Sequence, residues 1–336
     1  MNRKSLWVMV MLGLSGLGPV LAQQQSVRAL LQLQADRLDV LLVGREGDQI
    51  YYRRHDAPEG SSAALKAANI LGGEFEVEID ESLVNTALKE KKWDVAAQLI
   101  LARVNPALPY LDIRDNNAVD PAIQAGSFLM LAARKSGREE GDRARKTAER
   151  FYQAAFQVFR AVQRSSDWHP FGEAAGFRAV LCQIALGKLD EATSALAKAR
   201  VPARGDGAFG IYTLAQAKLK HARGDARVAI DLLIPSLLYE NKDIDVFPEV
   251  LMLLAQCYEE INEIHRTRDV FYEIARIFPG TEWADVARER LVVIRRENMT
   301  KDVEDVAVTT VFFAGKEDMD ALVDEYLEKS DIKTEK

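Results

Sequence analysis

Cysteine and histidine are scarce in this sequence, which has two cysteines and four histidines among 336 residues. Two cysteines exclude a disulfide framework and a zinc site of four cysteines. No histidine has a second histidine or cysteine at metal-ligand spacing, so the sequence predicts no metal site and no cofactor. Glycine-rich phosphate loops, the dinucleotide fingerprint and the nucleophile elbow are also missing. These absences favour a non-catalytic protein, although an active site assembled from distant residues would leave no such motif.

An excess of positive charge is lacking as well. The chain has 44 Lys and Arg against 51 Asp and Glu, a formal net charge of −7. Nucleic-acid binding depends on neutralising phosphates, so we expect no nucleic-acid partner. Acidic residues concentrate at the end of the chain, where residues 301–336 hold eleven acidic and five basic side chains. The sequence therefore predicts an acidic, partly helical tail over residues 298–336.

A single long apolar run is present, at the N-terminus. Residues 6–17 are apolar and follow two basic residues, and Val20 and Ala22 are small enough for signal peptidase to cut before Gln23. The run is shorter than the roughly 20 residues that a membrane span needs. We therefore predict a signal peptide over residues 1–22, an exported chain and no integral membrane span after cleavage. An uncleaved anchor is the alternative.

The two cysteines, Cys182 and Cys257, each lie in a helical pattern, with one helix pair between them. In a stacked array their separation would exceed the Cα limit of about 7 Å for a disulfide. We therefore expect two buried, unreactive thiols.

Residues 23–80 predict a short helix and a small antiparallel β-sheet. The spacing of Val27, Leu30 and Leu31 favours a helix within residues 23–37. β-Branched and aromatic residues at 38–43 and 49–54 predict a hairpin around a turn at 44–48. Strict alternation over residues 74–79 predicts a third strand.

Residues 81–297 change to a helical period, with apolar residues at i, i+3, i+4 and i+7. Two of the expected helices lie near residues 121–135 and 143–163. A run of short amphipathic helices with tight turns is a bundle or a solenoid.

An internal repeat favours the solenoid. Gly187, Gly224 and Asn262 stand 37 and 38 residues apart, near the period of helical-pair repeats. Each is followed five residues later by alanine or threonine, which allows the second helix of a pair to pack closely against the first. Lys91, with Ala96 after it, is a weaker fourth match. Gly or Asn suits the left-handed conformation that ends a helix.

The clearest unit runs from Pro248 to Pro279. It has Leu251, Leu254, Ala255 and Tyr258 in the first expected helix, Asn262 at the turn, Thr267, Phe271 and Ile274 in the second, and Pro279 at the end. At these positions the segment resembles the tetratricopeptide repeat (TPR) family, and the following run from Phe278 is similar to exported bacterial TPR proteins of the Tol–Pal accessory and β-barrel-assembly types. Thr267 and Ile274 stand where the family usually has alanine. The resemblance implies a mainly α fold, a TPR-like helical-pair solenoid preceded by the small antiparallel β element.

The resemblance also implies a function. First-helix residues of such repeats line a concave groove that binds peptides or partner helices. The implied location is the periplasm or the outer membrane surface, and the implied partner is an envelope protein or peptide. Two alternatives are a binder of an envelope glycan, for which Trp168, Phe171 and Trp283 supply aromatic rings, and an enzyme with an unrecognised site. Carried onto this sequence, the groove residues are Lys218, His221, Glu249, Met252, Gln256, Glu259 and Glu260.

Overall fold

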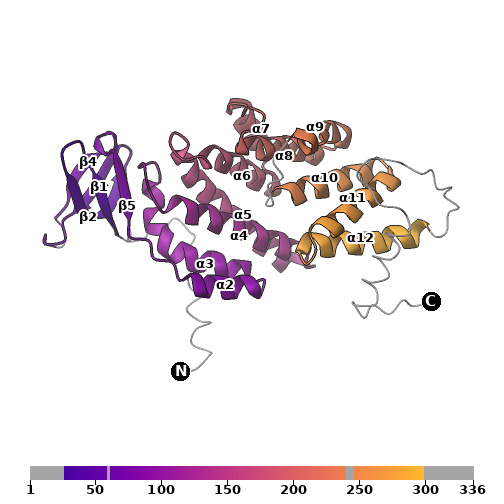
Figure 1. Ribbon diagram of the computed structural model, residues 1–336, viewed down its shortest axis with the longest axis horizontal. Helices are drawn as coiled ribbons and strands as arrows, with labels where there is room; N and C mark the ends of the chain where they lie inside the picture. The colour runs from indigo at the N-terminus through magenta and orange to yellow at the C-terminus, as the bar shows by residue number, and fades with distance from the viewer. Residues whose placement is uncertain (1–25, 59–60, 240–245, 299–336) are drawn as a thin grey trace, which may run out of the picture. The chain divides into compact units, whose positions relative to one another are not determined.

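The computed structural model describes residues 26–58, 61–239 and 246–298, and within these ranges the protein is mainly helical with one antiparallel sheet (Figure 1). The predicted signal peptide and almost all of the predicted acidic tail lie outside the described residues. By its internal contacts the chain divides into two compact units, Met1–Ala175 and Gly176–Lys336. The strands are β1 (Val27–Gln32), β2 (Arg37–Glu46), β3 (Gln49–Arg53), β4 (Ala63–Lys66) and β5 (Gly72–Phe75).

The described residues form eleven α-helices, of which α2 to α5 lie in the first unit and α6 begins at its end. Their bounds are α2 (Glu81–Lys89), α3 (Trp93–Val104), α4 (Val119–Arg138), α5 (Asp142–Val162), α6 (Gly172–Ala185), α7 (Leu189–Lys198), α8 (Gly207–Ala222), α9 (Ala226–Tyr239), α10 (Phe247–Glu260), α11 (Ile264–Ile277) and α12 (Glu282–Asn298). Short 3₁₀ turns, η1 (Ala67–Asn69), η2 (Asn105–Tyr110) and η3 (Gln163–Ser165), connect some of them. Helices α4 and α5 confirm the two predicted near residues 121–135 and 143–163.

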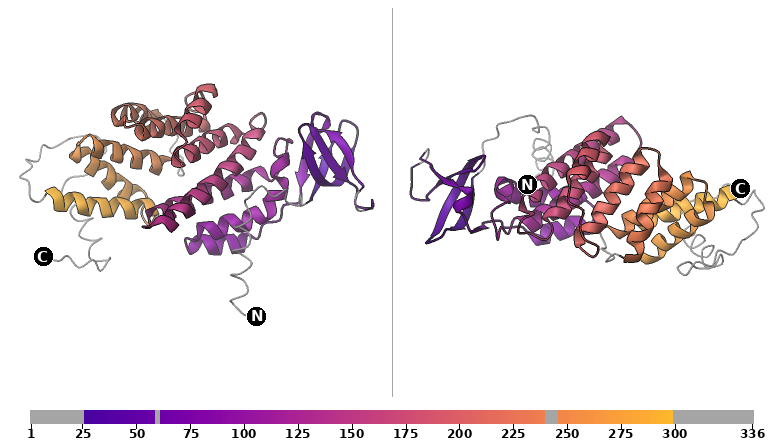
Figure 2. Two further views of the ribbon diagram at one scale, coloured as in Figure 1. Left: turned by 180° about the vertical axis from the view of Figure 1, so that it is seen from behind. Right: turned by 90° about the horizontal axis from the view of Figure 1, so that it is seen from above.

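The sheet, drawn in indigo and purple in Figure 2, has the strand order β4-β3-β2-β1-β5. Every neighbouring pair is antiparallel. The predicted hairpin is confirmed as β2 and β3. The helix expected within residues 23–37 is wrong, because residues 27–32 form β1, which lies between β2 and β5 in the sheet. β1 pairs with β2 on one side and with β5 on the other. Its side chains alternate strictly between buried and exposed, as they do in a strand with one face on the core. The third predicted strand is shorter than expected and ends at Phe75.

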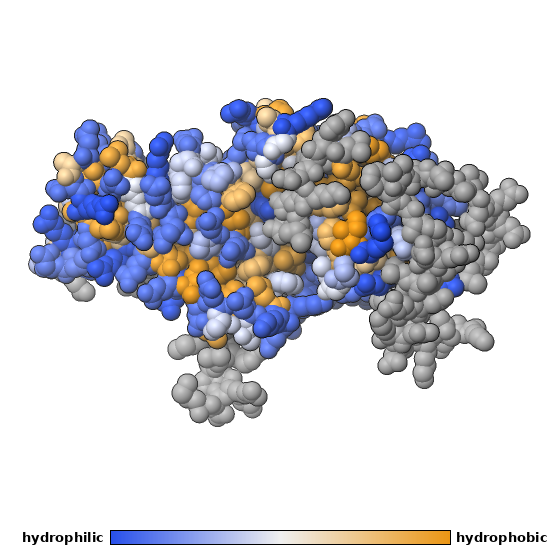
Figure 3. Space-filling view, in the orientation of Figure 1, coloured by the Kyte–Doolittle hydropathy of each residue, from blue (hydrophilic) through white to orange (hydrophobic). Residues whose placement is uncertain are grey.

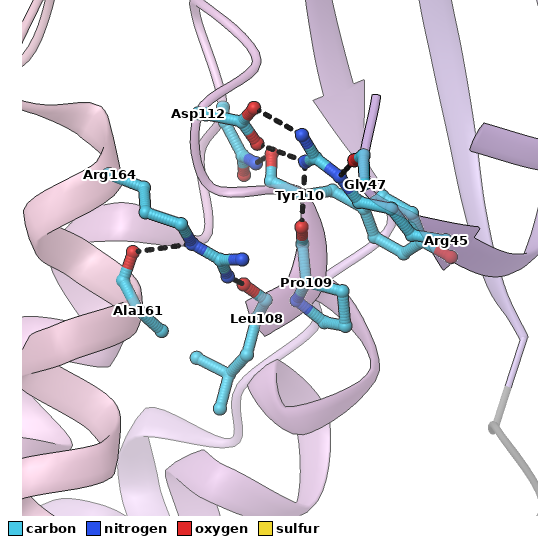
Figure 4. Close-up of polar contacts among 9 residues, drawn as sticks. Arg45, Gly47, Leu108, Pro109, Tyr110, Asp112, Ala161 and Arg164 are labelled. Carbon is cyan, nitrogen blue, oxygen red and sulfur yellow. Dashed lines mark hydrogen bonds and ion pairs between the residues drawn. The ribbon is translucent and has the colours of Figure 1, made fainter. Parts of the chain in front are cut away.

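A loop between η2 and α4 holds the sheet against the helices of the first unit. Asp112 in this loop accepts two hydrogen bonds from the guanidinium of Arg45 in β2, one of them 2.7 Å from Nη2 to Oδ2 (Figure 4). Arg45 Nη1 also donates to the carbonyl of Pro109 at 2.9 Å. On the helical side, Arg164 donates to the carbonyl of Leu108. Arg45 therefore contacts both η2 and the loop that follows it, and Arg164 contacts η2.

Four helical pairs share one turn geometry, namely α2–α3, α6–α7, α8–α9 and α10–α11. The repeat positions Lys91, Gly187, Gly224 and Asn262 all have positive φ, between 52° and 81°. In each turn the next N–H donates to the carbonyl five residues earlier, at 2.9 to 3.0 Å. This pattern satisfies carbonyls that the end of the first helix leaves free.

The small residue five positions after each turn is fully buried in all four pairs. Ala96, Ala192, Ala229 and Thr267 each have 0 % exposure. Close packing of each helical pair therefore requires the small residue at this position, because a larger side chain would force the two helices apart.

Hydrophobic side chains supply most of the buried residues, and on the face seen in Figure 3 the surface over the sheet is largely hydrophilic. Cys182 and Cys257 are both buried, as predicted. Burial raises the pKa of the Cys257 thiol to about 12. No helix in the described ranges is both long and apolar enough to cross a membrane.

Candidate functional site

The seven residues proposed to line a groove all lie on α8 and α10, the first helices of two successive pairs in the second unit. The structure brings five of them together in ion pairs between neighbouring first helices. These pairs join α8 to α10 and α10 to α12. They form a row of charged side chains, which we call the first-helix row and which consists of Lys218, His221, Glu249, Glu259, Glu260 and Arg290.

Lys218 of α8 pairs with Glu249 in the first turn of α10. Glu249 has only 5 % exposure, so its carboxylate has lost most of its contact with water. A buried carboxylate is costly unless a cation and hydrogen bonds compensate it. Lys218 is half-buried and supplies that compensation from the neighbouring pair.

His221, one turn further along α8, lies 2.7 Å from Glu260 between Nε2 and Oε1. With the ring proton on Nε2, the imidazole donates to the carboxylate. Glu260 is half-exposed and ends α10, so this contact lies at the solvent side of the row.

Glu259, next to Glu260, turns to α12 and pairs with Arg290. Both side chains are partly exposed. Adjacent glutamates therefore link α10 to two different helices, since neighbouring residues on a helix point about 100° apart.

The other two candidate residues differ in exposure. Met252 is buried at 7 % exposure and belongs to the core of α10, whereas Gln256 is exposed. The accessible part of the candidate groove therefore lies toward the C-terminal ends of α8 and α10. It comprises Gln256, Glu260 and the half-buried Lys218, His221 and Glu259.

Arg290 was missed by the sequence reasoning. A signal for it exists, because Lys218 and Glu249 are 31 residues apart and Glu259 and Arg290 are also 31 residues apart. Opposite charges at the same separation on successive first helices indicate contacts between those helices.

The aromatic candidates are divided between the two units. Trp168 and Phe171 belong to the first unit and Trp283 to α12 of the second. Trp168 and His169 meet edge to face at 5.2 Å between ring centres, and Phe171 is 53 % exposed. Among the described residues, no three His, Cys, Asp or Glu side chains are grouped so that they could hold a metal ion.

The comparisons with known proteins name no relative: no protein-family model, no curated protein and no solved structure matches this chain. Arguments about its function therefore rest on the geometry of the chain itself. The first-helix row consists of three carboxylates, one lysine, one arginine and one histidine, and its ion pairs link α8 to α10 and α10 to α12.

Proposed function

We propose that this protein is a non-catalytic, exported scaffold with TPR-like repeats that binds a protein or peptide partner in the cell envelope. The observation that carries the proposal is the repeated turn, in which four helical pairs share a left-handed residue and a fully buried small residue five positions later. Repeated helical pairs use their first helices to bind extended or helical segments.

The accessible end of the first-helix row indicates the partner's chemistry. Gln256 can both donate and accept hydrogen bonds, and Glu260 and Glu259 accept them. A partner segment with lysine or arginine side chains fits these groups, because the half-exposed carboxylate of Glu260 contacts the imidazole of His221 and still faces solvent. Lys218 and Arg290 keep Glu249 and Glu259 neutralised within the protein.

The export part of the proposal rests on residues 1–22, which lie outside the described residues. N-terminal sequencing of the protein from fractionated bacterial cells tests it directly. A periplasmic protein that begins at Gln23 supports export with cleavage. A cytoplasmic protein that begins at Met1 contradicts it.

The binding part is tested by a cross-linked pull-down from envelope extract, with the chain from Gln23 as bait. A double variant, Gln256→Lys with Glu260→Lys, puts positive charge where the partner's basic groups would lie. The matched control is Asp231→Lys, which places a lysine on the exposed side of α9.

Partners that bind the unchanged bait and Asp231→Lys, but not the double variant, support the proposal. Their affinity is then measured with purified protein, and we expect the double variant to bind at least about tenfold more weakly. Circular dichroism must show equal helix content in all three proteins. A partner retained equally by all three, or no saturable partner, contradicts binding at the first-helix row.

A further inference from the structure

An open cavity of about 520 Å³ lies in the first unit, whereas the first-helix row belongs to the second. A second hollow of about 220 Å³ adjoins it and shares Leu71 and Arg114. The larger volume falls within the roughly 300–1,000 Å³ typical of small-molecule sites. The residues that line it are Gln32, Leu71, Arg114, Asp115, Asp167 and Trp168.

Backbone contacts fix two walls of this cavity. The carbonyl of Arg114 accepts from the N–H of Gly73 at 2.8 Å, and the carbonyl of Gln32 accepts from the N–H of Leu71 at 2.8 Å. These bonds place the loop before α4 beside the edge strand β5. The hydrogen bonds therefore fix the positions of the cavity residues on the sheet relative to those on the loop.

Asp115 is held in an unusual conformation at the same place, with a φ of +59°. Left-handed φ costs a non-glycine residue about 1 kcal/mol or more. A Cβ atom on Gly72 would lie only 3.0 Å from Asp115 Oδ2, so glycine at position 72 leaves room for this carboxylate. Strained residues often mark functional sites.

Three charged side chains line the cavity without neutralising each other. Within the ranges that the structure describes, no hydrogen bond or ion pair engages the side chains of Arg114, Asp115 or Asp167. In the first-helix row, by contrast, Glu249 and Glu259 each pair with a cation, as Asp112 does with Arg45. Hydrogen-bonding groups that lack partners around one hollow are available to a ligand.

Trp168 adds a second indication. Its Nε1 is buried and has no hydrogen-bond partner among the described residues. Buried N–H groups nearly always have a partner, and an exception points to a missing water or ligand. The ring, together with the half-exposed Leu71, supplies the apolar part of the lining.

We infer that this cavity binds an uncharged saccharide, with the hydroxyl groups between Arg114, Asp115 and Asp167 and a sugar ring against Trp168. The two carboxylates disfavour an anion, and Arg114 disfavours a cation. Hydroxyl groups donate to carboxylates and accept from a guanidinium, so a polyhydroxyl ligand satisfies both signs of charge. The C–H face of a sugar ring suits the electron-rich face of an indole. The adjoining hollow provides space for a second sugar unit.

The test uses the chain from Gln23 labelled with 5-fluorotryptophan and observed by ¹⁹F NMR. The probes are N,N′,N″-triacetylchitotriose and cellotriose, uncharged β-linked trisaccharides with and without N-acetyl groups, with inorganic phosphate and spermidine as charged comparisons. Trp168→Phe assigns the Trp168 resonance, and the signals of Trp93 and Trp283 serve as internal references. Titration to about 10 mM detects even millimolar affinity.

We expect one trisaccharide to shift the Trp168 signal saturably and leave the two reference signals unchanged. Arg114→Gln and Asp167→Asn change exposed side chains and should fold normally, yet each should weaken binding by about tenfold, the effect of losing one good hydrogen bond to a charged group. Arg103→Gln, an exposed arginine of α3 outside the cavity, should bind as the unchanged chain does.

Three results would overturn the inference: no shift with either trisaccharide, saturable binding of phosphate or spermidine instead, or saccharide binding that Arg114→Gln and Asp167→Asn leave unchanged. The protein-binding proposal concerns a different unit and is tested by different variants. Failure of one proposal therefore leaves the other standing.

Discussion

Asn117 pairs with the backbone of Phe75 through both ends of its side-chain amide. The N–H of Phe75 donates to Asn117 Oδ1 at 2.9 Å, and Asn117 Nδ2 donates to the carbonyl of Phe75 at 2.9 Å. The side chain thus takes the place of a neighbouring strand at the last residue of β5. An edge strand has free backbone groups, and here a residue 42 positions away satisfies two of them.

Replacing Asn117 with alanine should destabilise the protein by about 1–3 kcal/mol, because two part-buried backbone groups lose their partners. Urea unfolding followed by circular dichroism measures the change. Asn105→Ala, an exposed asparagine at the start of η2, is the matched control and should stay within about 0.5 kcal/mol. Equal stability of the two variants would mean that the amide pairing contributes nothing.

The Arg45–Asp112 pair should be sensitive even to a conservative change. Arg45→Lys keeps the charge but loses the two-pronged contact with the carboxylate and the bond to the Pro109 carbonyl. We expect a loss of about 2 kcal/mol in the free energy of unfolding, as for hydrogen bonds to charged groups. Arg54→Lys, on an exposed arginine nearby, should change little. Identical unfolding curves for the two lysine variants would contradict the loop-anchoring role.

At the left-handed turn positions, replacing a glycine should lower the stability of the protein, and introducing a glycine should raise it. Gly224→Ala places a Cβ at a φ of +81° and should cost about 1–2 kcal/mol, although no atom lies within 4 Å of that position. Lys91→Gly removes the same strain at a φ of 52° and should stabilise the first unit by up to about 1 kcal/mol. Thermal unfolding of both variants checks the signs. A destabilised Lys91→Gly protein would show that side-chain contacts of Lys91 outweigh backbone strain.

Tyr110 should make the protein less stable in alkali. Burial raises its pKa to about 12 from the ordinary value of 10.0, and its exposure is 3 %. Between pH 10 and 12 the unfolded chain releases this proton while the native state keeps it, so stability falls as pH rises. The contribution is up to about 2 kcal/mol. Tyr110→Phe cannot ionise there, and its unfolding free energy should fall less across this window. An equal fall in both proteins would exclude Tyr110 as the cause.

The two thiols should resist modification in the native protein. Cys182 and Cys257 are buried, and the thiolate that reacts is disfavoured at Cys257, whose pKa is about 12. A colorimetric thiol reagent should therefore detect no thiol per chain at pH 8 and two in denaturant. Gln256→Cys, next to Cys257 but exposed, should add one rapidly reacting thiol. Rapid reaction of the unchanged protein would contradict burial.

Local signals predicted the helical pairs well. Gly187, Gly224 and Asn262 could be recognised because a left-handed helix end has few residue choices, and the small residue five positions later because a close helix contact allows no bulk. Lys91 fitted the pattern poorly, yet its turn has the same geometry. The backbone bonds of that turn therefore outweigh the residue's own preference.

The sheet was predicted less well. Val27, Leu30 and Leu31 fit a helical spacing as closely as an alternating one, and only pairing with β2 and β5 selects the strand. A short apolar segment can fit both the helical and the alternating period, so pairing with strands elsewhere in the chain decides which structure forms.

For the candidate site, the sequence determined which helices carry the polar residues, because the repeat assigns each residue to a first or second helix. Tertiary structure decided which of them are accessible, since burial of Glu249 and Met252 depends on neighbouring helices. It also decided the contacts that join residues 31, 42 and 67 positions apart. Local sequence sets the conformation of each turn and helix, whereas contacts at such separations form only when the folded core brings the elements together.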